Sequence, residues 1–179
     1  MELSAGRPAT IDRARVGVLV FLATEVMFFA GLFSAWVVLA PRREARLDLP
    51  LALAMTALLL ASSGCLHAAL AARANRRGRS LAFGFAALLL GLSFLGAMAW
   101  EWGVLFAAGE HPSNSLWWAC FFVLTGVHGL HVAAGALWIA CGWFAQARGG
   151  GGRALELAAP YWHFVDFVWL VLLWALYFD

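Results

Sequence analysis

Acidic and imidazole side chains recur inside the long apolar runs of this 179-residue sequence. The set comprises Glu25, Glu101, His128, His131, His163 and Asp166. His128 and His131 are three residues apart, as are His163 and Asp166, so each pair shares one face if its segment is helical. A buried carboxyl–imidazole pair satisfies both partners and can also relay protons, because His titrates near neutrality. Proton transfer and interhelical hydrogen bonding are therefore the two kinds of chemistry that these residues offer.

The segments that carry these side chains are predicted to be membrane spans. The chain is 64% hydrophobic and 12% charged, with a mean hydropathy of +0.82, whereas a soluble domain is about 45–50% apolar and about 25% charged. A spanning helix needs about 20 largely apolar residues. The sequence therefore predicts an all-α, polytopic membrane protein: one membrane domain over residues 1–179, with a bundle of five transmembrane helices. The predicted spans cover residues 16–39, 49–72, 81–108, 116–145 and 161–178.

The arginines predict the orientation of this bundle. The side of the membrane that holds the N-terminus carries Arg7, Arg13, Arg15, Arg73, Arg76, Arg77, Arg79, Arg148 and Arg153, and the other side carries Arg42, Arg43 and Arg46. Cytoplasmic loops are enriched in Arg and Lys, so we expect the N-terminus inside and the C-terminus outside. The net charge of +2 gives no indication of a nucleic-acid partner.

Depth in the bilayer groups most of the ionisable residues together. Glu25 lies nine residues into the first span, which is roughly 13 Å from the inner surface. His128 and His131 lie 12 and 15 residues in from the outer end of the fourth span. His163 and Asp166 lie near the start of the fifth span, which enters from inside. We therefore expect one polar layer in the inner half of the bilayer.

Two interpretations stay open for several of these residues. Each histidine can form an interhelical hydrogen bond worth roughly 0.6 kcal/mol or take part in a proton relay. A mid-bilayer carboxyl such as Glu25 must stay neutral or find a partner, and both situations favour a functional role. Glu101 lies between Trp100 and Trp102 near the outer interface, where a solvated residue of the aromatic belt is the simpler interpretation.

Other classes of protein fit the sequence less well. A b-type haem cytochrome needs two imidazoles that face each other from different helices, and axial ligands alone are a weak sequence signal. A proton-coupled transporter would use intramembrane carboxylates, but the sequence has neither an inverted repeat nor matched broken helices. No nucleophile–base pair or metal cluster indicates a stand-alone enzyme.

Three segments resemble subunit III of the haem–copper respiratory oxidases. EVMFFAGLFSAW, residues 25–36, is similar to the glutamate helix of that family. FFVLTGVHGLHVAAG, residues 121–135, resembles its paired-histidine helix, and YWHFVDFVWL, residues 161–170, resembles its final helix. LLLASSG (residues 58–64), Glu101 and Glu156 also match, in family order over nearly the whole chain. The chain resembles the short, five-helix form, which lacks the first helix pair.

The resemblance implies a non-catalytic subunit of a bacterial terminal oxidase of the cytochrome c oxidase type, which couples aerobic electron transport to proton pumping. It implies that this chain binds no haem, copper or other cofactor, and that haem and copper lie in partner subunits. Subunit I is then the main contact, with subunit II and small or supercomplex subunits as further partners, structural phospholipid between them, and the bacterial cytoplasmic membrane as the location. A quinol oxidase or a nitric oxide reductase is the alternative complex.

The resemblance also implies roles for individual residues. Glu25 corresponds to the family's carbodiimide-reactive buried carboxylate, and His128, His131, His163 and Asp166 match the polar residues near it. The implied role is rapid proton uptake into subunit I from the inner side and protection against inactivation during turnover. Glu101 is a further candidate for this role.

The lipid-binding residues are where the sequence departs from the family pattern. The family often has an arginine that binds lipid phosphate just after the paired-histidine helix, but Ala145 stands there, with Arg148 nearly one turn further on. The candidates for lipid contact are therefore Arg148, His131 and Trp36.

Overall fold

The computed structural model describes residues 12–39, 47–150 and 152–178, and every regular element in these ranges is helical. The helices are α1 (Arg13–Leu39), α2 (Leu49–Ala72), α3 (Arg77–Ala107), α4 (Leu116–Ala147) and α5 (Arg153–Leu173), which continues into the π-helical turn η1 (Trp174–Phe178). Within the described ranges, five helices are long and apolar enough to cross a membrane. The predicted all-α, five-span fold is therefore confirmed. Arg7, Arg42, Arg43 and Arg46 lie outside the described residues.

Several helices begin earlier than the predicted spans. α3 starts at Arg77 rather than at residue 81, and α5 starts at Arg153, eight residues before the predicted start at 161. Apolar runs identify only the part of a helix that lies in hydrocarbon, whereas the backbone helix continues into the headgroup region, where long charged side chains reach water. Pro160 lies inside α5 and does not end it, as is common in membrane helices whose neighbours compensate for the lost hydrogen bond.

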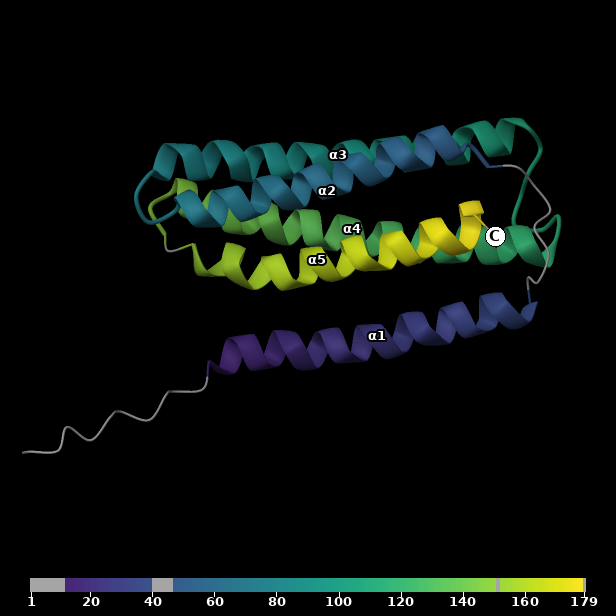
Figure 1. Cartoon of the computed structure of the whole chain (residues 1–179), viewed down its shortest axis with the longest axis horizontal. Coiled ribbons are helices and arrows are strands. Elements are labelled where there is room, and N and C mark those ends of the chain that lie inside the picture. Colours follow the sequence, from purple (N-terminus) through teal and green to yellow (C-terminus); the bar gives the residue numbers. More distant parts are fainter. Residues whose placement is uncertain (1–11, 40–46, 151, 179) are drawn as a thin grey trace, which may run out of the picture.

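The helices form a group of four with α1 at its edge. α2 packs chiefly on α3, α4 packs on both α3 and α5, and α5 also packs on α2. α1 packs on α4 and α5, and Figure 1 shows it on the side of α5 that faces away from α2 and α3. Phe29 and Trp36 are the buried side chains of α1, all of whose residues the structure describes. Most of the α1 surface is therefore exposed in the isolated chain.

Tryptophan 162 fills the centre of the four-helix group. This fully buried side chain of α5 packs between Gly91 of α3 and Gly135 of α4. A Cβ atom at Gly91 would come within 2.7 Å of the Trp162 ring, and one at Gly135 within 2.8 Å. Both glycines therefore provide the space that the ring occupies, and they let three helices meet around one aromatic side chain.

Local signals end the helices where the connections begin. Asp48 caps α2 by accepting a hydrogen bond from the Leu51 N–H at 3.0 Å, and Ser115 caps α4 in the same way. Gly109 and Gly149 have positive φ angles of 86° and 92° just after α3 and α4, a conformation that favours glycine at a helix C-terminus. The start of α1, the α2–α3 turn and the α4–α5 connection lie together at one end of the bundle (Figure 1), which we call the Arg-rich end.

Candidate functional site

Glu25 and His131 pair across the seam between α1 and α4. Nε2 of His131 lies 2.9 Å from Oε2 of Glu25, and the two side chains are 19% and 17% exposed. They are brought together because α1 packs against α4 with Phe29 next to the imidazole, at a ring distance of 4.9 Å. The structure thus gives the mid-span carboxyl an imidazole partner on a different helix.

The tautomer of His131 follows from its second contact. Nδ1 lies 2.8 Å from the carbonyl oxygen of Val127, one turn earlier on α4. A carbonyl only accepts hydrogen bonds, so Nδ1 carries a proton and donates. Nε2 then either accepts a hydrogen bond from protonated Glu25 or, in the imidazolium, donates one to the carboxylate. In both states one transferable proton lies between the two side chains, and the pair is electroneutral while it holds that proton.

Tyr161 links this pair to α5. Its hydroxyl donates to the carbonyl oxygen of His131 at 3.1 Å, and its ring stacks on Phe21 of α1 at 6.1 Å. Tyr161 therefore contacts both helices that form the pair, and it fixes the position of α5 relative to them.

A second polar cluster lies between α2 and α5. The hydroxyl of Ser63 donates to Oδ2 of Asp166 and lies 3.3 Å from Nδ1 of His163. Because a hydroxyl has a single proton, Ser63 can donate to Asp166 while it accepts from the Nδ1–H of His163. Asp166 is buried, whereas the side chain of His163 is 52% exposed. The cluster therefore connects a buried carboxyl to an imidazole at the protein surface.

His128 belongs to neither cluster. It is fully buried, its ring stacks on Trp169 at 5.4 Å, and Phe94 meets it edge-on at 5.7 Å. Neither of its ring nitrogens has a hydrogen-bond partner among the described residues. The five residues expected in one polar layer therefore occupy two interhelical seams and one aromatic cage.

Glu101 corrects one of the sequence interpretations. The sequence favours a solvated residue of the aromatic belt at this position, but Glu101 is only 4% exposed. The hydroxyl of Tyr177, in η1, lies 2.8 Å from both carboxyl oxygens of Glu101. Residue counting along α3 does not indicate which side of the helix Glu101 occupies. The π-helical turn at the end of α5 places the phenol against it, so the carboxyl faces the bundle.

Two ion pairs connect the helices at the Arg-rich end. Arg73, just after α2, lies 2.5 Å from Glu156 in the first turn of α5, and Arg153 lies 2.5 Å from Asp12, just before α1. Desolvation opposes ionisation of Asp12, but hydrogen bonds from the Arg15 N–H and from Arg153 outweigh it and hold the pKa of that carboxyl below its usual value. Asp12 is therefore negatively charged near neutral pH and pairs with the positively charged Arg153.

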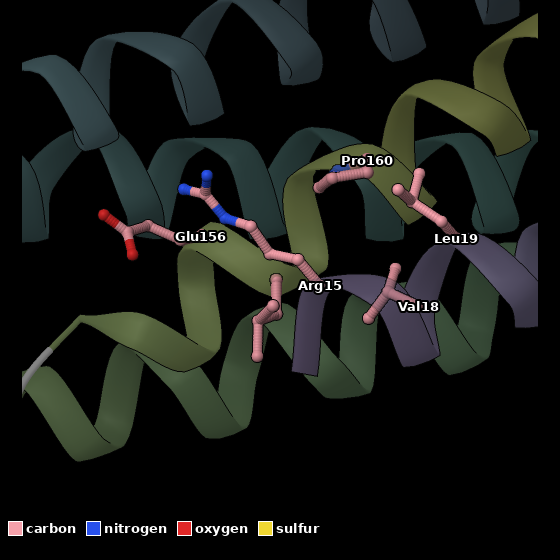
Figure 2. A pocket seen from close by; sticks show the side chains of 6 residues that line it. Arg15, Val18, Leu19, Glu156 and Pro160 are labelled. Atoms are coloured by element: carbon pink, nitrogen blue, oxygen red, sulfur yellow. The ribbon is translucent and has the colours of Figure 1, made fainter. Parts of the chain in front are cut away.

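A small amphipathic pocket opens beside these ion pairs. It has a volume of about 220 Å³ and is lined by Arg15, Val18, Leu19, Glu156, Leu157 and Pro160. Figure 2 shows the charged groups of Arg15 and Glu156 at one end and the side chains of Val18, Leu19 and Pro160 at the other. A pocket that is charged at one end and apolar at the other suits an amphiphilic molecule.

The three candidates for lipid contact lie in different surroundings. Arg148 follows the last residue of α4 and lines a shallow, exposed pocket with Phe144 and Ala145. Both ring nitrogens of His131 are already engaged, as described above. Trp36 is buried and packs edge-on against Trp117 at 5.8 Å. Of the three, Arg148 has the side chain that is open to a lipid headgroup.

Sequence reasoning missed the residues that complete each cluster. Ser63, Tyr161 and Tyr177 provide the hydroxyl groups, and none of them was a candidate. Ser63 lies inside the LLLASSG segment and Tyr161 at the start of YWHFVDFVWL, two of the segments that carried the family resemblance. Those segments therefore held a signal for the first two, whereas nothing in the sequence indicated the π-helical turn that positions Tyr177.

These observations define a class of protein: a polytopic helical membrane protein with carboxyl–imidazole contacts at its interhelical seams. The family model for cytochrome c oxidase subunit III matches residues 6–179. The chain therefore belongs to the cytochrome c oxidase subunit III family, and it is a subunit of a respiratory oxidase complex with partner oxidase subunits. Membership in this family argues against the two alternative classes, a b-type haem cytochrome and a proton-coupled transporter.

Three bacterial relatives are similar over most of their lengths. The chain is 34% identical over 173 residues to the cytochrome bo(3) ubiquinol oxidase subunit 3 of Pseudomonas aeruginosa. This alignment covers 90% of this chain and 82% of the relative. It is 33% identical to a probable cytochrome c oxidase subunit 3 of Nocardia farcinica, in an alignment that covers 98% of this chain and 91% of the relative. It is 32% identical to a probable quinol oxidase subunit 3 of Staphylococcus aureus, in an alignment that covers 91% of this chain and 87% of the relative.

Haem and copper belong to other subunits of such complexes, because subunit III does not itself bind them. Among residues 12–39, 47–150 and 152–178, no group of three or more His, Cys, Asp or Glu side chains is arranged to hold a metal ion.

Proposed function

We propose that this chain is the non-catalytic subunit III of a terminal oxidase of the cytochrome c type in the cytoplasmic membrane of a bacterium. The Arg-rich end faces the cytoplasm. The chain supports rapid proton uptake by the subunit that carries haem and copper, and it stabilises that subunit during turnover. It contributes no catalytic centre of its own.

The observation that carries this proposal is the Glu25–His131 pair. A carboxyl and an imidazole at 2.9 Å, near the middle of α1 and α4, hold one proton without net charge. Such a pair can take up a proton from the cytoplasmic side and release it without leaving an unpaired charge in the bilayer, where a charge costs about 2.5–3.5 kcal/mol. The half-exposed His163, with Ser63 and Asp166 behind it, offers a second proton-accepting group at the protein surface.

Phospholipid is part of the proposed function. The pocket between Arg15 and Pro160 has the charge at one end and the apolar wall that a lipid headgroup and its first acyl carbons require. Arg148 offers a second guanidinium at the same end of the bundle. Lipid held at these positions would separate the ends of α1 and α5 from water and thereby support the stability of the assembled complex.

A quinol oxidase is the second candidate. Two of the three relatives described above, those of Pseudomonas aeruginosa and Staphylococcus aureus, carry quinol oxidase names. The same seams would serve proton uptake in either complex, since electron donors react with other subunits. The haem type and the electron donor of the complex that co-purifies with this chain distinguish the two candidates.

The test uses the whole oxidase, purified in mild detergent through a tag on this chain, with Glu25→Gln as the variant. Glutamine keeps the size of the side chain but cannot carry the transferable proton. We expect proton uptake to slow by about threefold to tenfold, which corresponds to about 0.7–1.4 kcal/mol in activation free energy. The catalytic lifetime should shorten, and labelling of the chain by a carbodiimide should be lost.

Glu110→Gln is the matched control. Glu110 lies in the α3–α4 connection, outside the spans, so its replacement should change neither proton uptake nor labelling. Equal proton-uptake rates in Glu25→Gln and in the unchanged oxidase would refute the role of the pair. Failure of any haem–copper subunit to co-purify would refute the assignment to an oxidase.

A further inference from the structure

A row of small residues faces outward along α2. Ala57, Ala61, Gly64 and Ala68 are spaced by four, three and four residues, so they lie on one side of the helix. The first three are exposed, and no atom lies within 4 Å of a Cβ atom built at Gly64. Membrane helices associate where small residues let their backbones approach closely. This row has no partner among the helices that the structure describes.

Two imidazoles border the same row. His67 is exposed on α2, and the side chain of His163 on α5 is 52% exposed. His67 lies one turn after Ser63 on α2, and the hydroxyl of Ser63 lies 3.3 Å from Nδ1 of His163, so both imidazoles lie along the seam between α2 and α5. We name the surface formed by Ala57, Ala61, Gly64 and His67 on α2 with His163 and Phe167 on α5 the α2–α5 face.

The depth of these imidazoles excludes a lipid headgroup as their partner. His67 lies six residues before Arg73, and His163 lies seven residues after Glu156. At 1.5 Å per residue, both lie about 9–11 Å deeper than the Arg73–Glu156 ion pair at the Arg-rich end. A phosphate at the level of Arg73 would not reach them, and acyl chains offer no hydrogen-bond partner to a polar group in hydrocarbon.

Within the described parts of the chain, the hydrogen bond of His163 is made by Nδ1, which leaves Nε2 available to a partner. Nδ1 of His163 faces Ser63 at 3.3 Å, and Ser63 is bonded in turn to the buried Asp166. Nε2 therefore points away from this contact. A carboxyl group suits such a nitrogen in either protonation state, because it donates to the neutral ring or accepts from the imidazolium, as Glu25 does with His131.

A second copy of this chain would not provide that carboxyl. If two copies met through the α2–α5 face, histidines would meet histidines, and the nearest acid, Asp166, is only 6% exposed and bonded to Ser63. We infer that the α2–α5 face docks one transmembrane helix of a partner subunit, and that a carboxyl-bearing side chain of that helix meets His67 and His163. This inference rests on the proposed function, since the partner is a subunit of the same oxidase.

The first experiment places a photo-crosslinking amino acid at Leu60 in the intact oxidase. Leu60 is 51% exposed and borders the row of small residues, whereas Leu92, the control position on α3, is 47% exposed on another face. We expect Leu60 to crosslink to a transmembrane segment of a partner subunit that contains Asp or Glu, identified by mass spectrometry, and Leu92 to crosslink at least tenfold less. Crosslinks from Leu60 to lipid alone or to a second copy of this chain would overturn the inference. A crosslinking yield at Leu60 no higher than at Leu92 would also overturn it.

A matched pair of substitutions gives an independent readout. No atom lies within 4 Å of a Cβ atom built at Gly64 or Gly96, so we expect a leucine at either position to leave the fold intact. Gly64→Leu should lower the amount of this chain per haem-carrying subunit by about tenfold in the purified complex, and Gly96→Leu should not. Equal retention of both variants would overturn the docking face while leaving the proposed function standing. A chain that never co-purifies with a haem-carrying subunit would instead overturn the proposed function.

Discussion

Ser63 determines how Asp166 is held inside the bundle. The serine hydroxyl on α2 donates to Oδ2 of the carboxyl on α5, while Oδ1 is buried without a hydrogen-bond partner among the described residues. Within the described residues, the Ser63 hydroxyl therefore provides the hydrogen bond to the Asp166 carboxyl. Polar groups in the bilayer interior cannot turn to water instead, so the loss of this bond should be measurable.

Ser63→Ala is expected to destabilise the chain. The variant removes the bond to Asp166 and frees His163, and interhelical hydrogen bonds in membrane proteins are worth about 0.6 kcal/mol on average and about 1.7 at most. We expect a loss near the upper value, measured by denaturant unfolding in detergent. Ser93→Ala is the control, because Ser93 is exposed and bonds only to the carbonyl of Leu89 on its own helix. Equal losses in the two variants would contradict the role of Ser63.

The sequence identified the ionisable residues of the site but not their partners. Residue spacing paired His163 with Asp166 on one helix, and these two do lie 3.9 Å apart. The pairing of Glu25 with His131 joins residues 106 positions apart. Depth along a helix can be counted from the sequence, whereas the side of the helix that meets a given neighbour depends on how the helices pack. For that reason His128, three residues before His131, lies in an aromatic cage instead.

Among the elements, α5 depends on glycines in the helices around it. Trp162 fits between α3 and α4 only because Gly91 and Gly135 lack side chains. The apolar runs predicted all five spans, since length and hydropathy are properties of each segment alone. They did not predict that Gly135 is a contact point, because a glycine in a span looks the same whether it faces lipid or a tryptophan.

Gly135→Ala is expected to loosen the packing of α5. The new Cβ atom would come within 2.8 Å of the Trp162 ring and within 3.0 Å of the Tyr161 ring, so both side chains must shift. Overpacking of this kind costs about 1–3 kcal/mol, and the same unfolding measurement should detect it. Gly31→Ala on α1 is the control: no atom lies within 4 Å of its Cβ, and alanine is the better helix former by about 0.5–1 kcal/mol. A Gly135→Ala variant as stable as Gly31→Ala would show that the Trp162 contact does not limit packing.

Across the whole molecule, charge divides the two ends of the bundle. Within the described residues, the Arg-rich end carries Arg13, Arg15, Arg73, Arg76, Arg77, Arg79, Arg148 and Arg153. The α3–α4 connection, residues 108–115 at the opposite end, contains no arginine. Several of these arginines also have structural contacts: Arg77 donates to the carbonyl of Gln146 at 2.8 Å, and Arg73 pairs with Glu156. Arg73 and Arg77 therefore bind the helices together, and the whole set of arginines leads us to expect this end of the bundle in the cytoplasm.

Cysteine labelling of intact cells tests this orientation. In a variant whose Cys65, Cys120 and Cys141 are replaced by alanine, we expect Ser113→Cys, in the α3–α4 connection, to react with a membrane-impermeant maleimide from outside. Asn75→Cys, in the exposed α2–α3 turn, should react only after the membrane is broken, because arginine-rich connections stay in the cytoplasm. The reverse pattern would put the Arg-rich end outside. Proton uptake from the cytoplasm would then have to reach the Glu25–His131 pair, near the middle of α1 and α4, from the end of the bundle opposite the Arg-rich end.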